Sequence, residues 1–304
     1  MDAAELARII LSFVAIVGVG WLLRRFGVLK AEDARPINNV IIYAGLPAMI
    51  FRAVYNASLD RQLLGIAAVA WVCFIAIAAL AWLACSALKL PRVVCGGFVL
   101  AAALGNTGYI GYPISQAVLG DAGLVQAIFY DVFGTVAALL FVGLFIAERF
   151  GSSGERPINP IREALAFPAV IALFAGLLLQ QVAVPTSVSN AIDALATLVV
   201  PLIMISVGIS LRLGTLREHA LPLGALALLR LAVAPAVAWG VGSFVLKDPA
   251  ALRLVVLEAG VPSMMLTLVI GARFRLDTDF IASAILVTTV ASIATIPLWQ
   301  VLVS

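Results

Sequence analysis

Apolar segments long enough to cross a lipid bilayer follow one another along almost the whole sequence, and they constrain the fold more than any other feature. A membrane-spanning helix needs about 20 apolar residues. Ten such segments lie between polar, Gly- or Pro-containing breaks: residues 5–23, 36–55, 62–87, 93–118, 122–146, 163–183, 190–211, 219–246, 250–272 and 278–302. Of the 304 residues, 63% are hydrophobic and 12% charged. This composition excludes an ordinary soluble globular protein. The sequence therefore predicts an all-α integral membrane protein.

Lysine and arginine are distributed unevenly between the two sides that ten alternating spans would define. Thirteen lie on one side and five on the other, with Arg230 inside a span. The richer side is predicted to be cytoplasmic, so both termini of this multi-pass protein are expected on the non-cytoplasmic side of the cell (inner) membrane. The thirteen are Arg24, Arg25, Lys30, Arg35, Lys89, Arg92, Arg149, Arg156, Arg162, Arg212, Arg217, Arg273 and Arg275.

Other charged and sulfur-containing residues give no sign of further partners. The net charge of +3 is dispersed, so no nucleic-acid partner is expected beside the lipid bilayer. Cys73, Cys85 and Cys95 lack metal-ligand spacing and read as small buried hydrophobic residues. We therefore expect no metal and no cofactor. HExxH and GxSxG motifs are absent from the sequence, and an enzyme is not expected.

The polar stretch 147–162 divides the chain into residues 1–146 and 163–304, each with five predicted spans. Because five is an odd number, a duplicated five-span unit must insert upside down relative to its twin. Inverted repeats with interrupted helices in matching positions are typical of secondary transporters. Three matched pairs support a duplication: Pro47 and Pro201 (offset 154), Pro113 and Pro262 (149), and Asp121 and Asp277 (156).

Residues 104–115, LGNTGYIGYPIS, collect helix-breaking residues inside the fourth predicted span. A proline within a helix costs about 3 kcal/mol, and each glycine roughly 1 kcal/mol relative to alanine. Irregular backbone at membrane depth is tolerated only inside protein or beside water. We expect broken helices here and around Pro262 in the ninth span, with new half-helices beginning just after Pro113 and Pro262. A kinked but continuous helix is the alternative.

The two expected half-helix N-termini form a candidate site for a carboxylate. Each N-terminus exposes unpaired N–H groups and carries a partial positive charge of about half an elementary unit. Neighbouring polar side chains add donors and acceptors, and tyrosines could contact an organic body or simply pack beside a polar cavity. The candidate substrate-binding residues are Asn106, Thr107, Gly108, Tyr109, Gly111, Tyr112, Pro113, Pro262, Ser263 and Met264.

Three ionisable residues, Asp131, Arg230 and Glu258, fall inside predicted spans. On insertion scales each costs about 2.5–3.5 kcal/mol at the membrane centre, so each needs a partner, a cavity or neutralisation. One interpretation is a permanent ion pair of Arg230 with Glu258 or Asp131. A second is that Glu258 takes up and releases H+ during transport. A third is a cation site, for example for Na+, formed by Glu258 and freed carbonyls.

Together these motifs resemble the auxin efflux carrier family, which includes plant PIN carriers and bacterial organic-acid permeases. The resemblance covers nearly the whole chain, although the long central loop of the plant proteins is missing and Glu258 stands where they have Gln. The matching features are Asn106-Thr107 with Gly111-Tyr112-Pro113 in the fourth span, Ser206-Val207-Gly208-Ile209 in the seventh, Arg230 five residues before Pro235 in the eighth, and Ala259-Gly260-Val261-Pro262 in the ninth.

The resemblance implies ten helices in two inverted five-helix repeats, as in bile-acid symporters and sodium–proton antiporters, with the fourth and ninth helices crossing as broken helices. It implies transport helices 3–5 and 8–10, scaffold helices 1, 2, 6 and 7, and elevator-type movement of a small organic acid anion, auxin-like or malate/malonate-like. A homodimer through the scaffold helices is a further expectation. The alternatives are a sodium-coupled organic-anion symporter of the bile-acid type and a carrier-derived channel or sensor.

Overall fold

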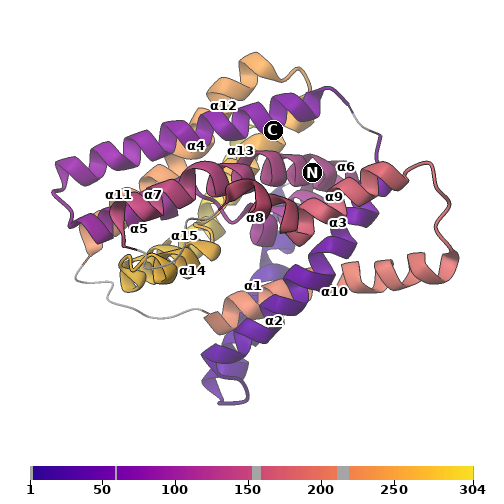
Figure 1. Ribbon diagram of the computed structural model, residues 1–304, viewed down its shortest axis with the longest axis horizontal. Helices are drawn as coiled ribbons and strands as arrows, with labels where there is room; N and C mark the ends of the chain where they lie inside the picture. Colours follow the sequence, from indigo (N-terminus) through magenta and orange to yellow (C-terminus); the bar gives the residue numbers. More distant parts are fainter. Residues whose placement is uncertain (1–2, 59, 153–158, 211–218, 304) are drawn as a thin grey trace. The chain divides into compact units, whose positions relative to one another are not determined.

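The computed structural model of the chain describes residues 3–58, 60–152, 159–210 and 219–303, and every regular element within these ranges is helical (Figure 1). Within the described ranges, six helical stretches are long and apolar enough to cross a membrane: Ala31–Tyr55, Gln62–Ala87, Thr107–Phe150, Thr186–Ser210, Ala220–Val245 and Thr278–Leu302. Shorter apolar helices lie at Arg92–Ala103 and Pro168–Leu179. An all-helical membrane protein is thereby supported, while the ten-span count and the inverted repeat stay predictions.

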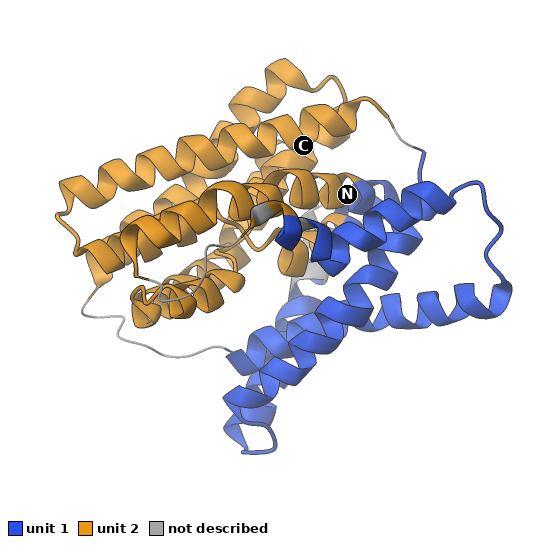
Figure 2. Ribbon diagram, viewed as in Figure 1, with its two compact units in different colours: residues 1–59, 116–125, 162–211 blue, residues 60–115, 126–161, 212–304 orange. Residues whose placement is uncertain are grey.

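The chain divides into two compact units (Figure 2). Unit 1 comprises residues 1–59, 116–125 and 162–211, and unit 2 comprises residues 60–115, 126–161 and 212–304. Each unit therefore takes segments from both halves of the sequence. Three residues counted in the charge asymmetry, Arg156, Arg212 and Arg217, lie outside the described residues, as does part of the predicted connecting stretch 147–162.

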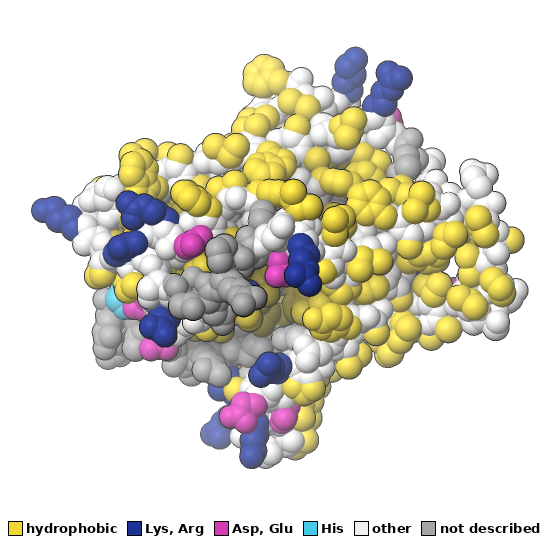
Figure 3. All heavy atoms as spheres, viewed as in Figure 1, with side chains coloured by type: hydrophobic (Ala, Val, Ile, Leu, Met, Phe, Trp, Pro, Cys, Tyr) yellow, Lys and Arg dark blue, Asp and Glu magenta, His cyan; other side chains and the backbone are white. Residues whose placement is uncertain are grey.

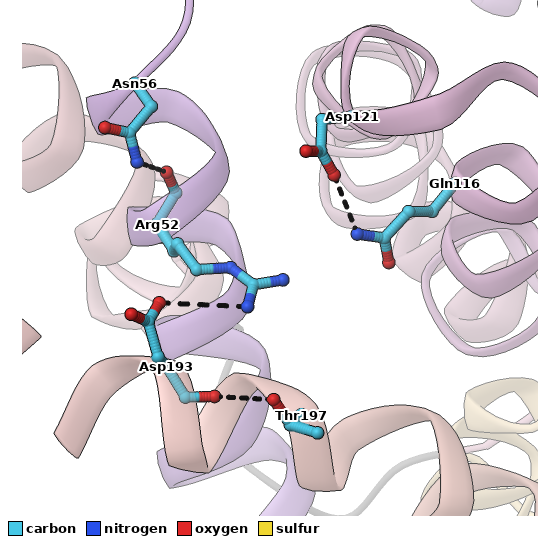
Figure 4. Close-up of polar contacts among 6 residues, drawn as sticks. All are labelled: Arg52, Asn56, Gln116, Asp121, Asp193 and Thr197. Atoms are coloured by element: carbon cyan, nitrogen blue, oxygen red, sulfur yellow. Dashed lines mark hydrogen bonds and ion pairs between the residues drawn. The ribbon is translucent and has the colours of Figure 1, made fainter. Parts of the chain in front are cut away.

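Unit 1 is built largely from the first helices of each half of the sequence. Its α3 packs against both α9 and α10, and its α1 lies along α10. Figure 4 shows the Arg52–Asp193 ion pair that joins α3 to α10, with Nη1 and Oδ1 3.8 Å apart. The elements are α1 (Ala3–Arg25), η1 (Ala31–Asp33), α2 (Ala34–Val40), η2 (Ile41–Gly45), α3 (Leu46–Tyr55), most of α8 (Pro160–Ala166), α9 (Pro168–Leu179) and α10 (Thr186–Ser210).

Two glycines allow α1 and α10 to approach closely. A Cβ atom on Gly20 would overlap the carbonyl oxygen of Ile205, and one on Gly208 would overlap that of Val17. Small residues serve this purpose at helix interfaces in membranes, where packing rather than water exclusion holds helices together. A Cβ atom on Gly18, one half-turn from Gly20, would meet nothing within 4 Å.

We expect Gly20→Ala to lower the free energy of unfolding by about 1–3 kcal/mol, the usual cost of overfilling a packed contact. Gly18→Ala is the matched control, because it makes the same change in the same helix without a neighbour. It should be neutral or slightly stabilising, since alanine favours a helix by about 1 kcal/mol over glycine. Thermal unfolding in detergent compares the two, and equal melting temperatures would contradict the close approach.

Unit 2 holds the remaining helices. Within it, α4 lies alongside α12, as Figure 1 also shows. The elements are α4 (Gln62–Ala87), α5 (Arg92–Ala103), η3 (Thr107–Gly111), the two ends of α6 (Tyr112–Phe129), η4 (Tyr130–Val136), η5 (Leu139–Gly143), α7 (Leu144–Phe150), α11 (Ala220–Leu228), η6 (Leu229–Val233), α12 (Ala234–Val245), α13 (Pro249–Ala259), α14 (Leu266–Arg273) and α15 (Thr278–Leu302).

The helix α6 contains a turn at Gly120, which has φ +70° and ψ −162°. A positive φ favours glycine, which has no Cβ atom. The amide of Gln116 donates to Asp121 Oδ1 at 3.0 Å across this turn (Figure 4). This turn lies in the LGDAG sequence (residues 119–123), where the sequence predicts the break between the fourth and fifth spans.

Proline is accommodated in three helical stretches by a preceding π-helical turn. The segments η2, η3 and η6 each end two residues before a proline, namely Pro47, Pro113 and Pro235. Proline lacks an N–H group and its ring clashes with the carbonyl four residues earlier. A wider π turn relieves both problems, and such turns often occur at functional sites.

Tryptophan indoles satisfy carbonyls in two π-helical segments. Trp71 Nε1 donates to Phe133 O in η4 at 2.8 Å, and Trp299 Nε1 donates to Leu231 O in η6 at 2.9 Å. Because lipid offers no hydrogen bonds, such internal partners are needed wherever a helix departs from regular pairing. These two segments carry Asp131 and Arg230, so the bonds hold the backbone beside both ionisable residues.

The outer surface fits a lipid environment. Figure 3 shows a face on which hydrophobic side chains predominate and charged side chains gather in a few groups. The helix α4, which is apolar throughout, exposes Leu64, Ile75, Trp82 and Leu83, each more than half accessible. Continuous exposed apolar surface of this kind is unusual for a soluble monomer. It therefore agrees with the membrane location that the composition predicts.

Candidate functional site

The backbone leaves helical form in both segments that the sequence singles out. The helix α5 ends at Ala103, and helical turns resume at Thr107 in η3. The helix α13 ends at Ala259, and α14 begins at Leu266. The residues between these helices, 104–106 and 260–265, are not helical. The kinked but continuous helix is therefore wrong for both segments.

The two interruptions lie side by side in unit 2 and pair with each other. Gly105 and Ser263 form an isolated antiparallel β-bridge. Asn106 N donates to Pro262 O at 2.8 Å, and Met264 N donates to Leu104 O at 2.9 Å. Each break thus supplies the hydrogen-bond partners that the other lost, which meets the requirement that buried backbone groups be paired.

Pro113 does not mark the start of its half-helix, contrary to the expectation. Helical structure resumes at Thr107, and Pro113 is the second residue of α6 after the π-helical η3. The reason is that glycine and asparagine release the backbone earlier in the segment, while the π turn accommodates the proline. Pro262 does lie within its interruption, but the next helix begins only at Leu266.

Arg230 caps the C-terminal ends of two half-helices at once. Its Nη1 donates to Ala102 O and Ala103 O at 3.3 and 3.2 Å, and its Nη2 donates to Ala259 O. The last carbonyls of a helix lack partners and carry partial negative charge. One guanidinium therefore serves the converging ends of α5 and α13. No ion pair joins it to Glu258 or Asp131, although the structure describes all three residues.

Asp131 is held by neutral hydroxyl groups. Thr107 Oγ1 donates to Asp131 Oδ1 at 2.5 Å, and Tyr112 OH donates to Asp131 Oδ2 at 2.6 Å. The carboxylate lies in η4, and both donors come from the half-helix that follows the first break. Each carboxylate oxygen thus has a partner, as buried polar groups require.

Glu258 contacts the same half-helix at other positions. It is fully buried at the end of α13, and Ser115 Oγ donates to its Oε1 at 2.6 Å. A Cβ atom on Gly111 would overlap its carboxylate. Its Oε2 has no hydrogen-bond partner among the described residues. The half-helix from Thr107 to Ser115 therefore touches two buried carboxylates, one through Thr107 and Tyr112 and the other through Gly111 and Ser115.

A small polar cavity adjoins these groups in unit 2. Comparison with the space that a buried water needs gives it room for about one water molecule. Arg230 and Glu258 both line it, so this conformation holds a guanidinium and a carboxyl group beside one enclosed space. The lining residues that carry polar side chains are Cys73, Thr107, Tyr130, Thr135, Arg230 and Glu258.

The candidate substrate-binding residues differ in their accessibility. Gly108 and Tyr109, at the start of the half-helix, are partly exposed. Tyr112 is 1% exposed and donates to Asp131, so its side chain is not available to a solute in this conformation. The remaining candidates are buried: Asn106, Thr107, Gly111, Pro113, Pro262, Ser263 and Met264.

Ser263 holds the crossing together rather than facing an open space. Its Oγ donates to Ala101 O at 2.7 Å, and its N–H donates to Thr288 Oγ1 at 3.1 Å. Sequence reasoning missed Thr288 and Ser115. Ser115 could have been found, because it follows Gly111 by four residues and so lies on the same helix face. Nothing in the sequence around Thr288 predicts its contact with Ser263.

Comparisons with known proteins agree with a role in the membrane. An "Uncharacterized transporter" of Methanothermobacter thermautotrophicus is 32% identical over 295 residues, which is 96% of each chain. Another of that description, from Methanocaldococcus jannaschii, is 32% identical over 302 residues with the same coverage. A protein of Rhizobium meliloti named "Putative malonate transporter" is 25% identical over 306 residues, covering 96% of this chain and 94% of the relative.

The family described as Membrane transport protein matches residues 7–300, almost the whole sequence. This confirms the resemblance drawn from the fourth, seventh, eighth and ninth predicted spans. The chain belongs to this membrane transport protein family, the auxin efflux carrier family.

Proposed function

We propose that the protein is a secondary transporter that moves a small organic acid anion across the cell membrane by alternating access. The paired interruption of two helices within unit 2 carries the proposal. A transporter site built from broken helices exposes half-helix N-termini to an anionic substrate. Irregular backbone at membrane depth is tolerated only where it is buried in protein or lines a cavity, and a substrate site of this kind supplies that setting.

The anion would bind at the start of the half-helix that begins at Thr107. The first N–H groups of a helix have no carbonyl partner within it, and they attract negative charge. Gly108 and Tyr109 are partly exposed there, and the Asn106 side chain does not cap the helix. These groups supply backbone donors, a neutral amide and an aromatic wall for a carboxylate.

A small mono- or dicarboxylate fits the charge available at this place. Arg230, which lies at the crossing, already donates to three carbonyls. Helix N-termini must therefore provide most of the attraction. Each carries only about half a positive charge, and the Asp131 carboxylate already lies beside this one. The Rhizobium relative is named for malonate, which makes malonate a suitable first probe. An indole-type acid remains the second substrate class to compare.

We propose an elevator-type movement in which unit 2 carries the site. Unit 2 contains both helix interruptions and the three buried ionisable residues Asp131, Arg230 and Glu258. Unit 1 collects the segments that the family resemblance assigns to a scaffold, apart from residues 116–125. The proposal includes two further points. The chain consists of two inverted five-helix repeats, and both of its termini lie outside the cytoplasm. Fusion of a topology reporter to each terminus tests the last point.

Reconstituted protein tests the transport function directly. Proteoliposomes are expected to take up radiolabelled malonate with saturable kinetics and to show accelerated exchange when the lumen is preloaded with unlabelled malonate. Exchange of this kind requires a site that alternates between the two sides. Flux that never saturates and shows no exchange would indicate a channel and overturn the proposal. A requirement for sodium would instead identify a symporter of the bile-acid type.

Asn106→Ala is expected to raise the KM for malonate about tenfold, the loss of roughly 1.4 kcal/mol that one hydrogen bond to a charged group supplies. Its melting temperature should stay near that of the wild type, since the helix does not depend on this side chain for its cap. Asn56→Ala is the control, because that exposed amide donates only to Arg52 O in the same helix. Unchanged KM in Asn106→Ala would remove Asn106 from the site.

A further inference from the structure

Two orphaned polar atoms line one cavity in unit 2. Arg230 Nε and Glu258 Oε2 are both buried, and neither has a hydrogen-bond partner within the described part of the chain. Arg230 and Glu258 line the same space, which has room for about one water molecule. Buried polar atoms are rarely left unpaired. A water molecule that accepts from Arg230 Nε and hydrogen-bonds to Glu258 Oε2 would satisfy both.

We propose that Glu258 binds and releases a proton that accompanies the substrate, and that this water molecule is its route. The inference rests on the proposed transport function and names the ion coupled to it. The charged and titratable groups around Glu258 are Cys73 on α4, Tyr112 on α6, Tyr130 and Asp131 on η4, and Arg230 on η6.

Charge balance among the three buried ionisable residues favours one bound proton in this conformation. Arg230 contributes one positive charge, while Asp131 and Glu258 would contribute two negative charges if both were ionised. A net buried charge is strongly unfavourable at membrane depth. One bound proton restores neutrality among these three groups without any further ion.

Hydrogen bonding assigns the proton to Glu258 rather than to Asp131. Both oxygens of Asp131 accept a hydroxyl hydrogen bond, from Thr107 and Tyr112. Among the described residues, Glu258 accepts one such bond, from Ser115. Hydrogen bonds to the charged form stabilise it, so Asp131 is the better solvated anion. Glu258 is accordingly the group that is neutral in this conformation.

A sodium ion is disfavoured in the same cavity because the Arg230 guanidinium lines it. Two positive charges at such short range repel each other strongly in a medium of low dielectric constant. A proton avoids this problem, because it neutralises the carboxylate instead of adding a second cation beside it. The geometry thus separates the proton and sodium interpretations that the sequence leaves open.

The half-helix between Thr107 and Ser115 links the proton to the substrate. Its first residues form the proposed anion site, while Gly111 and Ser115 contact Glu258. On one side of the membrane a hydronium ion gives its proton to Glu258 Oε2 and leaves water. On the other side a water molecule takes the proton back. An ionised Glu258 needs more than one donor, so deprotonation favours conformations that admit water to the cavity.

Infrared difference spectroscopy of the purified full-length protein tests the protonation state without any substrate. At neutral pH we expect the C=O stretching band of a buried, protonated carboxyl group in the wild type. The band should be absent in Glu258→Gln. Glu148→Gln, which removes an exposed carboxylate, should leave it unchanged. Absence of the band in the wild type, or its persistence in Glu258→Gln, would overturn the proposal.

Ser115→Ala keeps the test decisive if Glu258→Gln fails to fold. Removing the hydroxyl that donates to Oε1 should move the band to higher frequency, because a carbonyl that accepts no hydrogen bond has a stiffer bond. A band that stays in place would show that the protonated group is not Glu258. This result does not depend on the transport activity.

Proteoliposomes containing a pH-sensitive dye then separate coupling from transport. Labelled malonate is the probe, and an inward proton gradient should drive its accumulation together with acidification of the lumen. In Glu258→Gln we expect gradient-driven accumulation to fall to the level of protein-free liposomes, while malonate exchange persists without pH dependence. Unchanged gradient-driven accumulation in this variant would overturn proton coupling. Absence of malonate flux in the wild type would count against the proposed function, while the infrared result still decides the proton site.

Discussion

Replacing Arg230 with methionine is expected to leave little stably folded protein. The guanidinium donates to Ala102 O, Ala103 O and Ala259 O, and methionine offers none of these bonds. A buried carbonyl that loses its partner costs about 1–3 kcal/mol. Three such losses approach the whole stability of an ordinary domain, which is roughly 5–15 kcal/mol. We therefore expect poor yield and a broad, early thermal transition in detergent.

The reason for so large an effect is that Arg230 serves two helices together. The ends of α5 and α13 converge at the crossing, and their partial negative charges repel each other unless a cation lies between them. Arg61→Met is the matched control, because it removes an exposed guanidinium from unit 2. It should change the melting temperature little, since exposed charges contribute about 0–1 kcal/mol.

Arg230→Lys should give an intermediate result. A lysine ammonium is a compact charge without the planar fork that reaches separate acceptors. It can hold one helix end well, but not both in the arrangement of the native guanidinium. Wild-type stability in Arg230→Met would show that the two half-helices do not depend on this cap. In that case the Arg230 contacts would be incidental to the crossing.

The interrupted helices could be predicted from sequence because their cause is local. Glycine, asparagine and proline disfavour a regular helix at their own positions. Residues 104–115 and Pro262 therefore predict irregular structure without any knowledge of their neighbours in the fold. The residue at which the helix resumes could not be predicted in the same way. It depends on the π-helical segment η3, which lets the chain return to helix at Thr107 and still accommodate Pro113.

The partners of the ionisable residues could not be predicted, because they come from distant parts of the chain. One of the three interpretations of the sequence pairs Arg230 with a carboxylate, yet Arg230 donates to carbonyls 127 and 128 residues earlier in the sequence. Arg230 has these partners because α5 and α13 cross beside it, and the spacing of residues along the sequence does not show that the two helices cross. The contact of Ser115 with Glu258, 143 residues apart, has the same origin.

The second large effect is expected from Gly111→Ala. A Cβ atom at this position would overlap the Glu258 carboxylate, so either the half-helix or the carboxylate must move. Overfilling of this kind costs about 1–3 kcal/mol. Because the half-helix also carries the proposed anion site, malonate uptake should be lost as well. Gly240→Ala is the control, since a Cβ atom there would meet nothing within 4 Å.

A double-mutant cycle identifies the cause of the Gly111→Ala effect. Glu258→Ala removes the group that the new methyl would strike, so adding Gly111→Ala to this variant should cost little further stability. Residues in direct contact show coupling energies of about 0.5–3 kcal/mol, and here the coupling should be favourable. Thermal unfolding of the wild type, both single variants and the double variant gives the value.

Additive costs would show that Gly111→Ala acts through the backbone and not through Glu258. A favourable coupling would instead establish that the half-helix and the carboxylate occupy one tightly packed contact. In that arrangement a change in the volume or charge of the Glu258 side chain on the side that faces Gly111 is transmitted to the helix that begins at Thr107, because the two groups are in direct contact. The same contact that makes alanine intolerable at position 111 would then couple protonation of Glu258 to the anion site.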